Sequence, residues 1–148
     1  MSFLQLDPTT HRQLRAEIIT TALKMNAAGI NQGKSGNVSA RLNAAGDFLI
    51  TPTGVEYDRL RVESIVEVHA DGSHVGPLLP SSEWRFHRDI YAARADVCGI
   101  VHTHAAYATS LAVHGRGIPS FHYMVAAAGG HDIPGAPYAT FGTQALSE

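Results

Sequence analysis

The sequence predicts an α/β fold with a mainly antiparallel sheet and several helices. Three apolar segments of strand length, at 40–42, 48–51 and 64–69, follow one another with turn-forming stretches between them. Short turns join antiparallel strands, whereas parallel strands need a crossover of a dozen or more residues. Segments with apolar residues at helical spacing lie before and after these strands and supply the helices.

The first helix is predicted to begin at Asp7-Pro8, because Asp accepts hydrogen bonds from free N–H groups and Pro is tolerated at the first helical position. Gly29 is expected to end this helix. One face of the segment is largely apolar at helical spacing and consists of Leu14, Ile18, Thr21, Ala22 and Met25. We therefore expect this helix to be scaffold.

A glycine-rich stretch, Gly33–Ser39, precedes the first predicted strand at 40–42. Its glycines allow backbone N–H groups to turn toward an anion, and its Asn and Ser side chains add short donors. The spacing matches neither a Walker loop nor a dinucleotide-binding fingerprint. Composition alone leaves both an ordinary turn and an anion-binding turn open.

The return strand is expected at 48–51, and it ends in a second turn with hydroxyl and glycine residues, Thr51–Gly54. A short helical turn is expected at 57–60. The next strand, at 64–69, is followed by Asp71-Gly72, which is a strong hairpin signal. These turns are the reason for predicting an antiparallel sheet.

A second helix is predicted to begin at Pro80-Ser-Ser-Glu83, with Phe86, Ile90 and Ala93 on its inner face. A pair of Ser residues at a helix N-terminus is an ordinary cap. The free N–H groups and the helix dipole at such an end also suit an anion. Glu83, in the first turn, suits the dipole in either case.

A strand at 98–104 contains His102-Thr-His104. Residues two apart in a strand point the same way, so the two imidazoles are expected to lie side by side and to grip one metal ion. Taken alone, the pattern also fits two half-buried polar residues at a sheet edge. The single cysteine, Cys98, excludes an internal disulfide framework and is expected to be a small core residue.

A third helix is expected through Tyr107, Leu111 and Val113, followed by a short helix or packed loop at 122–130. Thr143 is predicted to be the N-cap of a helix over the last five residues. One isolated helical turn is not stable by itself, because nucleation outweighs its few hydrogen bonds. We therefore expect the sequence to be part of a longer protein.

The composition is that of a globular domain: 45 % of the 148 residues are hydrophobic, 16 % are charged, and the formal net charge is −2. No Lys/Arg run indicates nucleic acid. No apolar run approaches the ~18 residues of a membrane span, and the first residues lack a signal-peptide pattern. We expect one cytoplasmic domain over 1–148, incomplete at its C-terminus, with neither a nucleic-acid nor a membrane partner.

Four motifs resemble the class II aldolase/adducin family in order and spacing: Gly36-Asn-Val-Ser39, Thr51-Pro-Thr-Gly54, Pro80-Ser-Ser-Glu83 and His102-Thr-His104. Four further segments are similar to its L-fuculose-phosphate aldolase branch: Pro80-Ser-Ser-Glu-Trp-Arg-Phe-His87, His122-Tyr-Met, Ala126-Ala-Ala-Gly-Gly130 and Ala136-Pro-Tyr-Ala-Thr-Phe-Gly-Thr143. The resemblance extends from about Leu14 to Glu148.

The resemblance implies a three-layer αβα fold and a fourfold-symmetric homotetramer with active sites between subunits. It implies that His102, His104 and Glu83 hold one Zn²⁺ per subunit and that Glu83 is also the catalytic acid/base. Tyr123, reaching into a neighbour's site, would donate a proton to the departing aldehyde. The substrate phosphate would be bound by Gly36, Asn37, Thr53, Gly54, Ser81 and Ser82.

The implied reaction is zinc-dependent cleavage of a 1-phosphoketose of the L-fuculose 1-phosphate type. Its products would be dihydroxyacetone phosphate and a short aldehyde, L-lactaldehyde. A divalent cation stabilises, as a Lewis acid, the negative charge left when the C3–C4 bond breaks. A carboxylate beside that cation can move a proton only after it releases the metal, so Glu83 would have two roles.

Family members bind zinc with a third His in a downstream Asn-His-Gly or His-His-Gly segment, which is expected to lie beyond Glu148. We assign no third ligand among His114, His122 and His131, because none matches that motif. A related sugar-phosphate epimerase or dehydratase stays open as an alternative. The epimerases of the family typically have a motif similar to Pro-Ser-Ser-Asp, however, whereas this sequence has Glu83 at the last of these positions and therefore favours an aldolase. A non-catalytic adducin-like assembly module and an inactive fragment also stay open.

Overall fold

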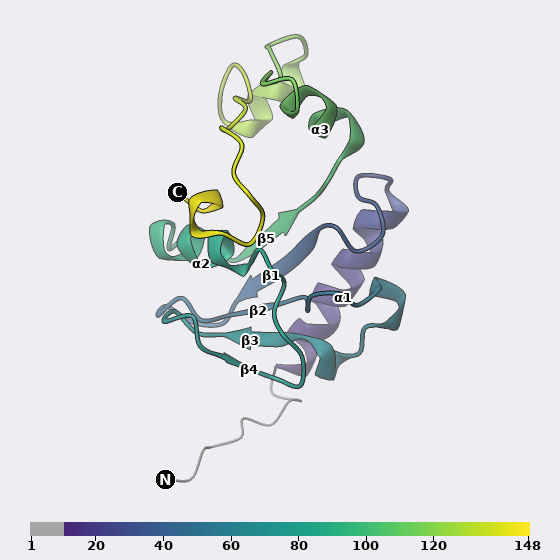
Figure 1. Cartoon of the computed structure of the whole chain (residues 1–148), viewed down its shortest axis with the longest axis vertical. Coiled ribbons are helices and arrows are strands. Elements are labelled where there is room, and N and C mark those ends of the chain that lie inside the picture. The colour runs from purple at the N-terminus through teal and green to yellow at the C-terminus, as the bar shows by residue number, and fades with distance from the viewer. Residues whose placement is uncertain (1–10) are drawn as a thin grey trace.

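A five-stranded antiparallel sheet with the strand order β4-β3-β2-β1-β5 is the centre of the computed structural model (Figure 1), which describes residues 11–148. The strands are β1 (Asn37–Arg41), β2 (Phe48–Ile50), β3 (Val66–Val68), β4 (His74–Val75) and β5 (Gly99–His102). The α-helices are α1 (Arg12–Ala27), α2 (Trp84–Ala93) and α3 (Ala106–Ala112). Short 3₁₀ helices are η1 (Tyr57–Arg59), η2 (Val62–Ser64), η3 (Tyr123–Ala128) and η4 (Gln144–Leu146).

The two faces of the sheet carry separate apolar cores, one beneath α1 and one beneath α2. The first core joins residues of α1 to alternate residues of β1 and β2: Ile18, Ala22, Met25, Val38, Ala40 and Leu49. The second joins α2 to the opposite face of the sheet: Phe48, Ile50, Val66, Val68 and Tyr91. The period of two in the strands therefore produces the predicted layers of helix, sheet and helix.

The same alternation places polar residues of β1 on the α2 face. Val38 and Ala40 face α1, so Asn37 and Ser39 face α2. Asn37 pairs with His102 across the β1–β5 ladder, and directly paired residues share a face. The register of one edge strand therefore brings His102 toward the start of α2.

A lobe formed by α3 and the segment up to about residue 140 lies beyond the end of β5 (Figure 1). It contains a bridge between Ile118 and Ile133 and the 3₁₀ helix η3. The chain then returns to α2, where η4 contacts the helix. Among the described residues, no helix combines the length and the apolarity that crossing a membrane requires.

Several predicted elements are confirmed. The α1 face with Ile18, Ala22 and Met25 is buried, Gly29 follows the helix end at φ 69°, and the turn at 57–60 is the 3₁₀ helix η1. The Asp71-Gly72 signal corresponds to the hairpin between β3 and β4. The predicted helix start at Asp7-Pro8 lies outside the described residues.

Other expectations were wrong in detail. β1 begins at Asn37 rather than at 40, because residues from 37 onward pair with β5. The residues of α2 that face the sheet are His87 and Tyr91, because both of these polar side chains are buried and bonded to Ser39. The predicted inner face had instead consisted of Phe86, Ile90 and Ala93.

Three further expectations at chain ends and edges also changed. Cys98 is exposed rather than in the core, because it precedes the edge strand β5. The strand predicted to reach His104 ends at His102. Thr143 is the N-cap residue of η4, as predicted, but its side chain makes no capping hydrogen bond and instead donates to the Thr140 carbonyl at 2.7 Å.

Candidate metal centre and active site

Glu83, His102 and His104 come together on the α2 side of the sheet. Their ligand atoms all lie within 4.8 Å of one another. The two His Nε2 atoms are 3.0 Å apart, and His102 Nε2 is 3.3 Å from Glu83 Oε2. The three side chains that the family resemblance implied as metal ligands therefore lie close together.

Each of the three side chains is positioned by a different element. Glu83 is the N-cap residue of α2, His102 ends β5, and His104 follows two residues later. Asn31, which is 4 % exposed, fixes the His104 backbone by accepting its N–H at 3.1 Å. Asn31 lies in the loop after α1, and nothing in the sequence had indicated that it supports His104.

Gly36 is required by the close approach of this loop to β5. A Cβ atom on Gly36 would overlap the His102 carbonyl oxygen and would lie 2.7 Å from Asn31 Oδ1. Such contacts are shorter than real Cβ atoms make. The glycine therefore allows the backbone that carries His102 to pack against the loop that holds His104.

The three donors fit a divalent cation. Two imidazole nitrogens and one carboxylate oxygen are ligands that Zn²⁺ commonly takes, at about 2.0–2.2 Å. Two nitrogens on one tetrahedral zinc ion are about 3.3 Å apart at such bond lengths, close to the 3.0 Å observed. Co²⁺ and Mn²⁺ accept the same donor set.

The electrostatics also favour a neutral imidazole at His102. Burial lowers the pKa of His102, and the neighbouring His104 lowers it further, against the opposing effect of the Glu83 carboxylate. Neutral imidazole is the form that binds a metal ion. A pocket of about 430 Å³, lined by Gln32, Ser35, His104, Ala106 and Thr109, opens beside the cluster.

Behind Glu83, a chain of buried polar side chains runs into the second core. Asn37 Nδ2 donates to Glu83 Oε2 at 2.8 Å, and Asn37 Oδ1 is bonded to His87 Nε2. His87 Nδ1 lies 2.6 Å from Ser39 Oγ, which in turn is 2.8 Å from the Tyr91 hydroxyl. No sequence motif had assigned a role to His87, although its spacing of four from Glu83 places both on one side of a helix.

The residues expected to bind phosphate lie in three turns that the fold brings together. An isolated bridge pairs Pro52 with Pro80, so the turn with Thr53 and Gly54 lies beside the one with Ser81. Ser81 N–H donates to the Thr51 carbonyl at 3.0 Å, and Lys34 Nζ donates to the Gly54 carbonyl at 3.3 Å. Ser81 is buried and Ser82 is exposed.

Asn37 differs from the other expected phosphate ligands. Its side chain is 1 % exposed, and both of its polar atoms bond to Glu83 and His87. The amide is therefore committed to the interior rather than presented to a ligand.

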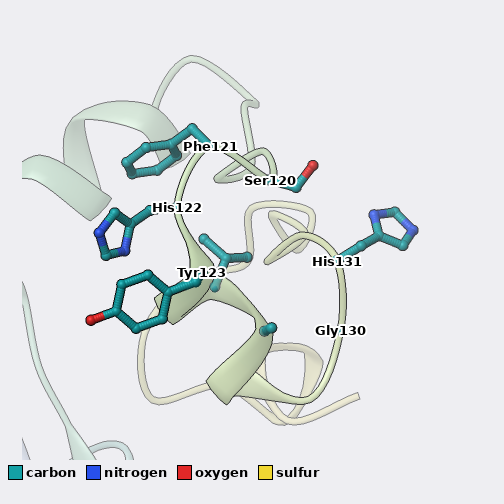
Figure 2. A pocket seen from close by; sticks show the side chains of 8 residues that line it. Ser120, Phe121, His122, Tyr123, Gly130 and His131 are labelled. Atoms are coloured by element: carbon teal, nitrogen blue, oxygen red, sulfur yellow. The ribbon is translucent and has the colours of Figure 1, made fainter.

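Tyr123 lies in the lobe, at the start of η3, and is 79 % exposed. The rings of Phe121, His122 and Tyr123 project to one side of the segment, away from His131 (Figure 2). Together with neighbouring residues they line a second pocket of about 410 Å³. Within residues 11–148, no contact joins Tyr123 to the metal cluster of the same chain.

The three spare histidines stand apart from the cluster. His122 Nδ1 accepts the Met124 N–H at 3.2 Å, and His131 lies 3.4 Å from Asp132 at the surface. Neither they nor His114 contribute to the group of ligands found among the described residues.

Residues 16–148 match the family described as the class II aldolase and adducin N-terminal domain. The chain belongs to this family. It is 50 % identical over 136 residues to L-fuculose phosphate aldolase of Escherichia coli K12, covering 92 % of this chain and 62 % of that protein. It is 51 % identical over 141 residues to a 5-methylthioribulose-1-phosphate/5-deoxyribulose-1-phosphate aldolase of Rhodospirillum rubrum. This match covers 95 % of this chain and 62 % of that protein.

The solved structures agree on the fold. An L-fuculose 1-phosphate aldolase superposes with a TM-score of 0.86 and 36 % identity, covering 91 % of this chain and 64 % of that one. The L-fuculose-1-phosphate aldolase of Thermus thermophilus superposes with a TM-score of 0.75 at 26 % identity, covering 92 % of this chain and 67 % of that one. The chain therefore has the class II aldolase fold, and it spans about 62 % of the length of the Escherichia coli and Rhodospirillum rubrum relatives.

Proposed function

We propose that the protein is a class II, metal-dependent aldolase that cleaves a 1-phosphoketose to dihydroxyacetone phosphate and a short aldehyde. The observation that carries this proposal is the convergence of Glu83, His102 and His104 in a chain of the aldolase family. When bound, Zn²⁺ would act as a Lewis acid toward the charge that develops at the broken carbon–carbon bond. His102 and His104 would hold it, together with Glu83.

Glu83 is proposed to move the proton of the reaction. Its Oε2 atom accepts a hydrogen bond from Asn37 and lies 3.3 Å from His102, so the carboxylate stands between the cluster and the core. A carboxylate beside the metal ligands is placed to take up or return a proton at a group bound to that metal.

The phosphate is proposed to bind where the three turns meet. Gly36, Thr53, Gly54, Ser81 and Ser82 would supply backbone N–H groups and hydroxyls, with the N-terminus of α2 close by. Lys34 Nζ also lies there, bonded to the Gly54 carbonyl, although the Glu56 carboxylate at 3.3 Å offsets its positive charge. The Asn37 side chain is left out of this set, because both of its polar atoms are bonded in the interior.

Tyr123 is proposed to act in a neighbouring subunit. It is exposed, its ring projects to the side of the segment opposite His131 (Figure 2), and it does not contact the Glu83, His102 and His104 cluster of its own chain within the described residues. A homotetramer with sites between subunits would give this hydroxyl a place as proton donor to the departing aldehyde.

Two sugar phosphates are supported as substrates. L-fuculose 1-phosphate, which would release L-lactaldehyde, follows from the Escherichia coli relative at 50 % identity. A 5-methylthioribulose or 5-deoxyribulose 1-phosphate follows from the Rhodospirillum rubrum relative at 51 % identity. We put L-fuculose 1-phosphate first, because the L-fuculose 1-phosphate aldolase structure superposes with a TM-score of 0.86.

The test measures metal content and cleavage on one sample. We expect close to one zinc ion per chain and EDTA-sensitive release of dihydroxyacetone phosphate from L-fuculose 1-phosphate. His102→Ala with His104→Ala should lose both, whereas His131→Ala, in an exposed loop, should lose neither.

Each other outcome has a defined meaning. Cleavage of 5-methylthioribulose 1-phosphate alone would transfer the proposal to the second substrate. Bound metal without cleavage of either substrate would overturn the aldolase proposal in favour of an epimerase or dehydratase. The absence of both metal and cleavage would favour an inactive fragment or a non-catalytic adducin-like module.

A further inference from the structure

Five side chains form a continuous buried hydrogen-bonded series, here called the polar chain: Glu83, Asn37, His87, Ser39 and Tyr91. None of the five is more than 8 % exposed, and His87 is completely buried. Water therefore cannot replace a lost partner, and each polar atom depends on its neighbour in the series.

Chemistry fixes the direction of every bond in the polar chain. An ionised carboxylate only accepts, so the Asn37 amide must turn its NH₂ toward Glu83 and its oxygen toward His87. That oxygen needs the N–H of His87 at Nε2. Because a neutral imidazole has one N–H, its Nδ1 accepts from Ser39, whose oxygen then accepts from the Tyr91 hydroxyl.

The neutral state of His87 is secured by its surroundings. Burial, together with the nearby His102, lowers the pKa of His87 to about 3. A protonated ring would present a second N–H to Ser39 and would add a buried charge. The ring therefore keeps one N–H, and the polar chain keeps one direction.

We infer that His87 is a positioning residue, which holds the Asn37 amide in the one orientation that anchors Glu83 beside His102. Without the His87 donor, the buried Asn37 oxygen has no partner, so the amide shifts to find one and its NH₂ no longer holds Glu83 beside the cluster. Both polar atoms of Asn37 serve this purpose, so its side chain positions Glu83 rather than binding phosphate. The inference rests on the proposed function of Glu83.

The experiment compares two substitutions of His87. His87→Leu removes the donor, and His87→Gln retains it, because the Gln amide nitrogen takes the place of imidazole Nε2. Partners one step removed from a metal typically change affinity or activity 10–100-fold. We expect His87→Leu to weaken Zn²⁺ binding and to lower kcat by about 10-fold or more, with KM within about twofold.

The matched variants separate positioning from stability. His87→Gln should remain within about threefold of the parent in Zn²⁺ affinity and kcat. Val68→Ala removes methyl groups from the same core without touching the polar chain, so it should lower stability alone. Equal impairment in the Leu and Gln variants, or zinc binding unchanged in both, would overturn the inference.

Nitrogen-15 NMR of the metal-free parent gives an answer that depends on neither variant folding nor on substrate. The His87 ring should show the Nε2–H tautomer, and an Nδ1–H tautomer would overturn the inference. If no sample cleaves sugar phosphate while the zinc affinities follow the expected order, the proposed function fails and the positioning role stands.

Discussion

Glu83 is held from two directions at the level of single atoms. Its Oε2 atom accepts from Asn37 at 2.8 Å on the core side and lies 3.3 Å from His102 on the metal side. A carboxylate with a fixed donor on one side and the two imidazoles on the other can bind a cation and can also accept a proton. The two roles proposed for Glu83 therefore need only one side chain.

We predict that Glu83→Gln lowers kcat for sugar-phosphate cleavage by about 10²–10⁴-fold, the usual contribution of a positioned acid/base. The amide has nearly the same shape, and the three turns do not depend on the Glu83 charge. Binding of inorganic phosphate, measured by calorimetry, should stay within about twofold of the parent. Activity equal to that of the parent would exclude the acid/base role.

At Gly36, a single methyl group is predicted to disturb the cluster. Gly36→Ala would drive Cβ into the His102 carbonyl oxygen, so the backbone of β5 must shift. Overpacking of this kind costs about 1–3 kcal/mol. We expect that loss in urea unfolding, together with weaker Zn²⁺ binding.

Gly29→Ala is the matched control for this prediction. Gly29 has a φ of 69°, but no atom lies within 4 Å of the place that a Cβ would take, so the variant tests backbone strain without a clash. A left-handed Ala costs about 1–2 kcal/mol, and Zn²⁺ binding should be unchanged. If both variants bound zinc equally well, the close packing at Gly36 would not matter to the site.

At the scale of elements, α2 shows what sequence pattern can and cannot predict. The helix was expected from its Ser-Ser-Glu start and helical spacing. However, Phe86 and Ile90, which were predicted to be buried, each lie one position before a residue that faces the sheet. Apolar side chains predict the face that packs on a core, whereas here His87 and Tyr91 turn inward to bond Ser39. A pattern that counts only apolar residues cannot include a buried polar network.

One acidic side chain on α2 connects the helix to the end of the described chain. Asp89 Oδ2 accepts from Gln144 Nε2 at 2.9 Å and from the Ser147 hydroxyl. Partial burial raises the pKa of Asp89, but hydrogen bonds from Arg88, Ser147 and Gln144 outweigh it, so the pKa falls to about 2. The carboxylate thus holds η4 against the helix.

We predict that Asp89→Asn increases hydrogen exchange of the Thr143 and Ser147 amides severalfold, because η4 loses its acceptor. A depressed carboxyl pKa stabilises the fold above about pH 4, and this contribution is lost as the pH falls toward 2. The protection of these amides in the parent, relative to their intrinsic exchange rate at each pH, should therefore fall toward that of Asp89→Asn over the same pH range.

Asp96→Asn provides the control for this prediction. The hydrogen bond from Arg94 lowers the pKa of Asp96 to about 2 as well, but this pair lies in the loop after α2 and does not contact η4. Loss of the Arg94–Asp96 pair in the Asp96→Asn variant should leave hydrogen exchange of the Thr143 and Ser147 amides unchanged. A similar increase in both variants would show that general charge, not the Asp89 contact, protects η4.

At the scale of the molecule, the antiparallel sheet and the pairing of the two His followed from local rules, whereas the place of Glu83 beside them was expected only from the family resemblance. Short turns predicted the sheet, and the spacing of His102 and His104 predicted their meeting. What did not follow was long-range: the 3.1 Å bond that ties Asn31 to His104, and the polar chain from α2 across to β1. These contacts depend on strand register and on the packing of α2, which no local pattern encodes.

The polar chain also makes the stability of the whole molecule depend on pH. Burial lowers the pKa of His87 to about 3, whereas an unfolded His has a pKa near 6.5. The unfolded chain therefore binds one more proton at this residue between these values. The contribution of His87 is fully present above about pH 6.5 and is lost as the pH falls toward 3.

We predict that His87→Gln flattens the pH dependence of the unfolding free energy, because it removes that proton. Between pH 4.5 and 5.5, the slope should be smaller than in the parent by about 1.4 kcal/mol per pH unit, the value for one proton. Urea unfolding at several pH values measures this slope. Ile50→Val, which trims the same core without removing a titratable group, should lower stability and keep the parent slope. A slope unchanged in His87→Gln would mean that the ring is not held neutral in the folded protein, and would remove the basis for a single direction in the polar chain.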